Sequence, residues 1–158
     1  MAVQDPASAP SRKHGGAISV PVERQNGVSW VAGSPVSAED LRPLIADNVG
    51  WIAQNPFGWQ ETFDSPRIVT VSEGHALWGE QDIGLETTAR LARSLGIKTL
   101  LRPHIWLTEN RDGKWLGAIE MKSDEDWGKW FADYRAFILH YAALAEHTEQ
   151  PVAVHLDR

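Results

Sequence analysis

The stretch Lys98-Thr-Leu-Leu-Arg-Pro-His104-Ile-Trp106 decides the fold prediction for this chain. It indicates a short apolar strand that ends at its proline, which cannot donate to a backbone ladder. A helical pattern ending at Gly96 precedes it, and a long aromatic helical pattern follows it. A strand between two helices is the repeating unit of a parallel α/β sheet, in which ligands lie at the carboxyl ends of the strands. Arg102, His104 and Trp106 therefore fall where a binding site is expected.

Composition narrows the class of protein. The chain has 158 residues, a net charge of −6 and no cysteine. This length suits one domain and is too short for most complete (β/α)8 barrels. Nucleic-acid binding needs a basic patch, which is missing here, and without cysteine there is neither a disulfide nor a thiolate metal site. No apolar run reaches the roughly 18 residues of a membrane span, and there is no signal-peptide pattern, so no membrane partner is expected and the compartment stays open.

Periodicity along the chain predicts one structured domain after a leader. Residues 1–26 are polar and aperiodic, so we expect a disordered leader, followed by a domain over 27–158. Strands are expected at 27–32, 50–54 and 98–102, with a fourth beginning at 152–154, and helices at about 40–48, 84–95 and 124–146. Long loops are expected at 55–79, with a minor β segment at 67–72, and at 103–122.

The ends of the helices carry local signals. Ser37 or Asp40 could be the N-cap of the first helix, and Pro43 favours Asp40 because proline would then fall in the first turn. Gly96 is expected to end the second helix in a left-handed conformation. Ser123 is expected to cap the third helix, which has an acidic first turn.

This order of elements predicts an α/β fold with parallel strands and about three and a half βα units. Two architectures fit it: a small open sheet, or the N-terminal part of a (β/α)8 TIM barrel. The long loops all follow strands, which is the asymmetry of a barrel with its site on one face.

Eight tryptophans are many for a chain of this length. They could fill a core, or they could form flat surfaces on which sugar rings stack. Trp127 and Trp130 lie on the apolar stripe of the third helix and are expected in the core. The tryptophans that could stack on sugar rings are expected in loops after strands: Trp59, Trp78, Trp106 and Trp115.

Several motifs in order resemble glycoside hydrolase family 113, which contains bacterial β-mannanases. They are Asn26-Gly-Val-Ser-Trp30, Asn55-Pro-Phe-Gly-Trp59, Trp78-Gly-Glu80, the stretch from Leu95 to Trp106, and Tyr134-Arg-Ala-Phe-Ile-Leu-His-Tyr-Ala-Ala-Leu-Ala-Glu146. The resemblance covers about residues 26–148 and implies a (β/α)8 barrel that hydrolyses β-1,4-mannan with retention. The residues that it implies as contacts to a mannan-type oligosaccharide are Trp30, Asn55, Trp59, Trp78, Glu80, Arg102, His104 and Trp106.

Retaining hydrolysis uses two carboxyl groups, and the resemblance implies glutamates at the ends of the fourth and seventh strands. The residues after Thr148 depart from the family pattern and carry no counterpart of the first glutamate. We therefore expect a chain truncated before its catalytic pair, with no catalytic residue of its own. The alternative is a carbohydrate-binding or self-assembling half-barrel without catalysis, in which exposed strand edges would make a homo-oligomer.

The remaining polar candidates have two interpretations each. The amides Gln54, Asn55 and Gln60 could bind sugar hydroxyls or cap a loop, and Glu80 could position substrate or cap the second helix. His75 with His104, Glu73 or Glu109 lacks the spacing of metal ligands, so no metal or cofactor is expected.

Overall fold

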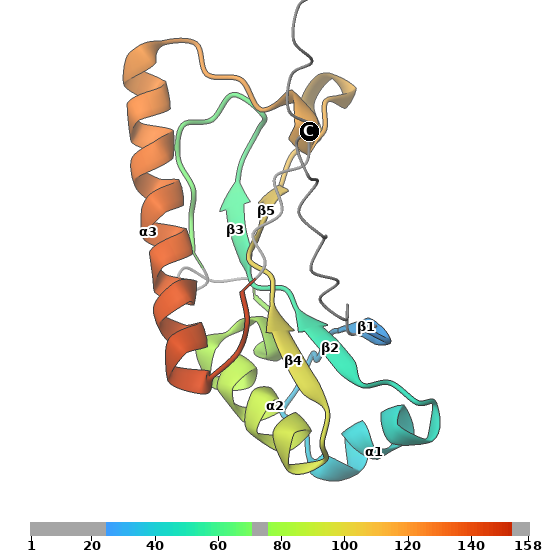
Figure 1. The fold of residues 1–158 in the computed structure, drawn as a ribbon. Helices are drawn as coiled ribbons and strands as arrows, with labels where there is room; N and C mark the ends of the chain where they lie inside the picture. Colours follow the sequence, from blue (N-terminus) through green and yellow to red (C-terminus); the bar gives the residue numbers. More distant parts are fainter. Residues whose placement is uncertain (1–24, 71–75, 153–158) are drawn as a thin grey trace, which may run out of the picture.

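The computed structural model describes residues 25–70 and 76–152 of the chain (Figure 1). Most of the expected leader, residues 1–24, lies outside the described residues. Three strands form a parallel sheet in the order β1-β2-β4, and two more form a parallel pair, β3-β5. Their bounds are β1 Gly27–Trp30, β2 Trp51–Gln54, β3 Phe57–Gln60, β4 Lys98–Leu101 and β5 His104–Leu107.

Three helices accompany these strands, and in the described residues no helix is long and apolar enough to cross a membrane. In Figure 1, α1 and α2 lie beside the three-stranded sheet, whereas α3 runs along the β3-β5 pair. The helices are α1 Ala38–Ala46, α2 Asp82–Ser94 and α3 Asp124–Thr148, with short 3₁₀ turns η2 Trp78–Glu80, η3 Arg111–Gly113 and η4 Leu116–Ala118.

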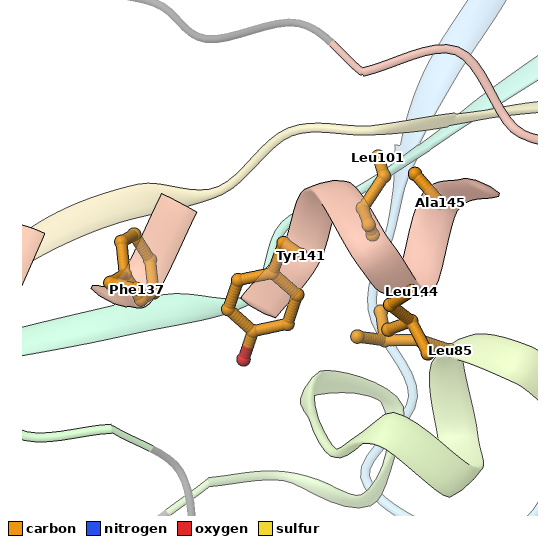
Figure 2. Close-up of a cluster of buried hydrophobic side chains, with 6 residues drawn as sticks. All are labelled: Leu85, Leu101, Phe137, Tyr141, Leu144 and Ala145. Carbon is orange, nitrogen blue, oxygen red and sulfur yellow. The ribbon is translucent and has the colours of Figure 1, made fainter. Parts of the chain in front are cut away.

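Two apolar clusters hold the helices on one face of the sheet. Leu41 of α1 packs with Ile52 of β2, Ala92 of α2 and Ile97. The second cluster joins α2, β4 and α3 (Figure 2), and it consists of Leu85, Leu101, Phe137, Tyr141, Leu144 and Ala145. Burial raises the pKa of Tyr141 far above its ordinary value, with smaller contributions from Asp82 and Glu80. The helical stripe predicted from the sequence therefore forms the core of the domain.

The start of α1 corrects the predicted cap. Ser37, not Asp40, is the N-cap, and the helix begins at Ala38. Asp40 Oδ2 accepts hydrogen bonds from the backbone N–H of Ser37 at 2.7 Å and from its hydroxyl at 2.8 Å. A capping box requires this three-residue spacing. The box sets the start of the helix and leaves Pro43 inside it.

The strand β3 is a further correction, because this segment was expected to be loop. The chain of β2 resumes as β3 after Asn55 and Pro56, and the chain of β4 resumes as β5 after Pro103. As predicted, β4 ends before Pro103, but pairing unexpectedly resumes beyond the proline. The N–H of His104 donates to the carbonyl of Pro56 at 2.9 Å, so the pairing continues one residue later.

Other local predictions are confirmed. Gly96 follows α2 with a φ of +75°, and the hydroxyl of Ser123 accepts a hydrogen bond from the N–H of Asp126 at 3.1 Å at the start of α3. The expected β segment at 67–72 is reduced to one antiparallel bridge between Val69 and Trp59. Residues 71 and 72 lie outside the described residues. Val152 forms a parallel bridge with Leu101, where the fourth strand was expected, and residues 153 and 154 also lie outside the described part.

Candidate functional site

The register of the strands separates two faces of the sheet. The strands β2 and β4 are interrupted at Pro56 and Pro103, after which the chain continues as β3 and β5. Leu101 pairs with Gln54 before this interruption, and His104 pairs with Phe57 after it, with the same offset in sequence. The register is therefore unbroken, and side chains alternate between the faces along the whole length. A Cβ on Gly58 would lie 3.2 Å from Phe137 of α3, so Gly58 faces the helix. We call the opposite face of β3 and β5 the inner face.

Four aromatic rings gather on the inner face, at the carboxyl ends of the strands. The ring of Phe57 lies 5.5 Å from Trp59, 6.0 Å from His104 and 5.7 Å from Trp106, measured between centroids. Trp106 is 49% exposed, whereas Phe57 and Trp59 are half-buried. We call these four residues the aromatic cluster. Its rings are tilted or edge-on to one another, and the half-exposed indole of Trp106 offers an apolar face to solvent.

Phe57 is the member of this cluster that sequence reasoning missed. It lies in the segment expected to be loop, and its neighbours Pro56 and Gly58 weaken any strand pattern. The available signal was the spacing of Phe57 and Trp59, which places both rings on one face of an extended segment.

Two buried polar atoms at the cluster have no hydrogen-bond partner within the part of the chain that the structure describes. They are the amide oxygen Oδ1 of Asn55, an acceptor, and the indole Nε1 of Trp59, a donor. Asn55 precedes Phe57 by two residues, so it shares the inner face with the cluster, and the same register places Arg102 opposite Asn55. Because buried polar groups in proteins are almost always hydrogen-bonded, the pair is suited to a ligand that carries hydroxyl groups.

Three other residues predicted to be near the sugar-binding site have side chains on the face of the sheet that packs against the helices. Gln54 donates from Nε2 to the carbonyl of Leu85 at 3.1 Å. Gln60 donates from Nε2 to the carbonyl of Thr62 at 2.8 Å. Trp30 packs against the cluster formed by α1, β2 and α2. The geometry thus supports a structural role for these residues and leaves Asn55 as the amide on the inner face.

The turn η2 carries Trp78 and Glu80 past the end of β1. The N–H of Gly79 donates to the carbonyl of Ala32 at 2.8 Å, which ties the turn to the chain after β1. Glu80 accepts a hydrogen bond from the N–H of Leu77 at 3.0 Å. Burial raises the pKa of the Glu80 carboxyl, and the bond from Leu77 lowers it by less. This arrangement supports the capping interpretation of Glu80, and no ring contact joins Trp78 to the aromatic cluster among the described residues.

An ion cluster connects the loops that follow β3 and β5. The carboxylate of Asp64 is only 6% exposed and contacts Arg111 and Lys122, the latter at 2.7 Å. It also accepts a hydrogen bond from the hydroxyl of Thr62 at 2.8 Å. These partners hold the pKa of Asp64 well below its usual range. The hydrogen bond from Lys122 lowers it most, followed by those from Thr62 and Arg111. The partners come from two separate loops, so no local sequence pattern indicated them.

The structure contains no group of three or more His, Asp or Glu side chains placed to bind a metal within residues 25–70 and 76–152. Trp115, the remaining loop tryptophan, lies beyond β5, where it is 62% exposed and packs over Gly117. It is not part of the aromatic cluster.

The solved structures similar to this chain include β-mannanases of family 113. The family 113 β-mannanase AaManA from Alicyclobacillus acidocaldarius, solved in complex with ManMIm, has a TM-score of 0.60 and 27% identity, and the match covers 72% of this chain and 36% of that chain. A family 113 β-1,4-mannanase complex has a TM-score of 0.63 and 23% identity, over 79% and 42% of the two chains. A further family 113 β-1,4-mannanase structure has a TM-score of 0.61 and 22% identity over the same shares.

This chain therefore spans less than half the length of each of these mannanases. Its parallel α/β fold corresponds to part of theirs, and it is a glycoside hydrolase-like domain. The comparison with curated proteins found no match. The family model for Glycoside Hydrolase Family 113 matches residues 27–154, which is most of the chain. The chain belongs to glycoside hydrolase family 113.

Proposed function

We propose that the inner face binds a mannan-type oligosaccharide, and that the chain corresponds to about three and a half βα units from the N-terminal part of a (β/α)8 barrel. The observation that carries the proposal is the aromatic cluster with an unpaired donor and an unpaired acceptor beside it. A hexose has an apolar C–H face and a rim of hydroxyl groups, so it needs a flat ring together with hydrogen-bonding partners.

Each residue of the inner face has a part in this binding. The half-exposed indole of Trp106 stacks on one sugar ring, and Phe57 holds that indole edge-on at 75° between the ring planes. The N–H of Trp59 donates to a sugar oxygen, and Oδ1 of Asn55 accepts from a hydroxyl. His104 and Arg102 supply further polar groups at the same end of the strands. Trp30, Trp78 and Glu80, which the family resemblance also implied, lie outside this set.

Binding without hydrolysis is the second part of the proposal. Retaining hydrolysis requires two carboxyl groups roughly 5–5.5 Å apart. The six residues assigned to the inner face are Asn55, Phe57, Trp59, Arg102, His104 and Trp106, and none of them carries a carboxyl group. These residues would therefore bind the polysaccharide, and cleavage would need carboxylates that they do not supply.

Isothermal titration with mannohexaose tests the binding site. Wild-type protein should bind with a Kd below about 1 mM, equivalent to roughly 4 kcal/mol. Trp106→Ala should abolish or greatly weaken the heat, whereas Trp115→Ala, which removes a more exposed tryptophan outside the cluster, should leave it unchanged. No heat at millimolar ligand, or equal losses in both variants, would contradict the proposal. Release of reducing ends from mannan would contradict binding without hydrolysis.

Self-assembly is the alternative function, and the open edge of the sheet supports it. In the described residues β1 pairs with β2 alone, so its other edge has free backbone groups. Light scattering coupled to size exclusion distinguishes the two: a defined dimer that does not bind mannohexaose favours assembly over carbohydrate binding.

A further inference from the structure

The turn that follows β3 reverses the chain and brings it back along the same strand. It spans Thr62 to Ser65, and the N–H of Ser65 donates to the carbonyl of Thr62 at 3.1 Å. The returning segment runs between β3 and α3 (Figure 1). There Val69 and Trp59 exchange two backbone bonds of 2.8 Å, with each N–H donating to the carbonyl of the other residue. The backbone of Trp59 is therefore held at this edge by a segment that the turn delivers.

Asp64 lies inside this turn and stabilises its shape. Its Oδ1 accepts a hydrogen bond from the hydroxyl of Thr62 at 2.8 Å, and that hydroxyl lies 2.9 Å from the hydroxyl of Ser65. The N–H of Thr62 also donates to the Ser65 hydroxyl at 3.3 Å. Short polar side chains that bond to one another and to the nearby backbone stabilise tight turns. The carboxylate of Asp64 thus holds the turn from within.

The same carboxylate connects the turn to the loop that follows β5. Arg111 and Lys122 of that loop both contact Asp64, whose side chain is nearly buried. Beside it, the carbonyl of Phe63 accepts a hydrogen bond from the N–H of Glu120 at 3.0 Å. Because a buried carboxylate is stable only when it is paired, these contacts favour one position of the turn relative to the loop.

The indole of Trp59 depends on the backbone beneath it. The rotamers open to a side chain depend on φ and ψ, which the two bonds with Val69 restrain. The ring of Phe57, at a centroid distance of 5.5 Å, supports the indole on one side. A hydrogen bond weakens steeply once its angle falls below about 120°. A loosened turn would therefore release the bridge and let the indole N–H turn away from a ligand oxygen.

We propose that Asp64 is a positioning residue of the sugar site, which orients the N–H of Trp59 through the turn and Val69. This N–H is buried and has no partner among the described residues, so it is the atom of Trp59 with a bond to gain from a ligand. Asp64 itself need not touch the sugar. The effect on binding rests on the proposed function, whereas the mechanical link from Asp64 to Trp59 does not.

Titration with mannohexaose tests the role through a double-mutant cycle. Asp64→Asn keeps the shape of the side chain and removes its charge, and it should raise the Kd about three- to tenfold, as for one lost hydrogen bond. Added to Trp59→Phe, the same change should raise the Kd less than about twofold further, because the donor that Asp64 positions is already gone. The matched control Asp112→Asn removes an exposed carboxylate 3.9 Å from Arg111 and should leave the Kd unchanged.

Two results of this cycle would overturn the proposal. One is an unchanged Kd in folded Asp64→Asn. The other is an equal effect of Asp64→Asn with and without Trp59→Phe, because Asp64 would then act independently of that donor. If circular dichroism shows that Asp64→Asn does not fold, Lys122→Ala replaces it in the cycle and the same outcomes decide. The Lys122 side chain is 74% exposed, and its removal leaves Arg111 paired with the carboxylate.

Hydrogen exchange tests the mechanical link without sugar. In Asp64→Asn the amides of Trp59 and Val69 should exchange several-fold faster than in wild type, because their bridge opens more often. The amide of Ile97, which donates to Ala92 at 2.9 Å beside the lower sheet, is the control and should keep its rate. Equal acceleration at all three amides, or none at Trp59 and Val69, would overturn the link. If wild-type protein binds no sugar, the proposed function fails, and the exchange rates still decide whether Asp64 positions Trp59.

Discussion

The indole N–H of Trp130, on α3, donates a hydrogen bond of 2.9 Å to Oε1 of Gln60, at the end of β3. Both side chains are buried, Gln60 completely. The other end of the same amide donates to Thr62, so one glutamine connects the helix, the strand and the following loop. This bond joins α3 to the short pair of strands that presents the aromatic cluster.

Trp130→Phe should destabilise the protein by about 1–3 kcal/mol, because it leaves the buried Oε1 of Gln60 without a donor. Urea unfolding followed by circular dichroism measures the change. Phe131→Leu is the control, since Phe131 lies next to Trp130 and is 58% exposed. A loss for Phe131→Leu as large as that for Trp130→Phe would show that the bond itself contributes little.

Gly58→Ala should destabilise the protein by about 1–3 kcal/mol through overpacking. The added methyl would lie 2.9 Å from Ile68, 3.0 Å from Ile105 and 3.2 Å from Phe137. Gly128→Ala on α3 is the opposite case, because nothing lies within 4 Å of its added methyl. It should stabilise the helix by about 0.5–1 kcal/mol. Thermal unfolding measures the change in stability of each variant. Changes of the same sign in the two variants would contradict this account of the packing.

Asp64→Asn should weaken the connection between the two loops at neutral pH. Because the pKa of Asp64 is lowered in the folded protein, its carboxylate contributes stability that is fully present above about pH 4. This contribution is lost as the pH falls through the lowered pKa. The difference in Tm between wild type and variant should therefore be larger at pH 7 than at pH 2. Asp112→Asn is the comparison, since that exposed carboxylate lies 3.9 Å from Arg111. It should change the Tm less, and a pH-independent difference for Asp64→Asn would contradict the argument.

Trp59→Phe should raise the Kd for mannohexaose by about two- to tenfold, as expected for one lost hydrogen bond. The substitution keeps an aromatic ring and removes only the unpaired N–H donor. Trp30→Phe is a matched control, because its N–H is also buried and unpaired but lies among the core residues of α1 and α2. Affinity that falls equally in both variants would point to a general loosening of the fold rather than to a bond with sugar.

Sequence periodicity predicted the elements whose signals are local. The apolar stripe of α3, the left-handed Gly96 and the cap at Ser123 each depend on neighbours within a few residues, and each is confirmed. The strand β3 escaped prediction because it has four residues and pairs with a segment more than forty residues away. Its existence depends on tertiary contacts, which no local pattern contains.

The same distinction applies to the candidate site. His104 and Trp106 were predicted from their position after a strand, and the structure places them together on β5. Phe57 was missed along with its strand. Asp64 pairs with Arg111 and Lys122, which both lie in a loop that is remote from it in sequence. Only the folded chain brings these charges together.

The interruption at Pro56 and Pro103 divides the structure into a lower sheet of three strands and an upper pair. The upper pair is attached to α3 by the bond from Trp130 to Gln60. The segment that bridges to Trp59 through Val69 is attached by a 3.0 Å bond from the N–H of Ile68 to Asp133. The arrangement of the aromatic rings therefore depends on α3 as well as on the pairing of β3 with β5. Under the proposed function, ligand binding and helix folding are thermodynamically linked, so an oligosaccharide on the inner face would lower the population of states in which the first turns of α3 are open.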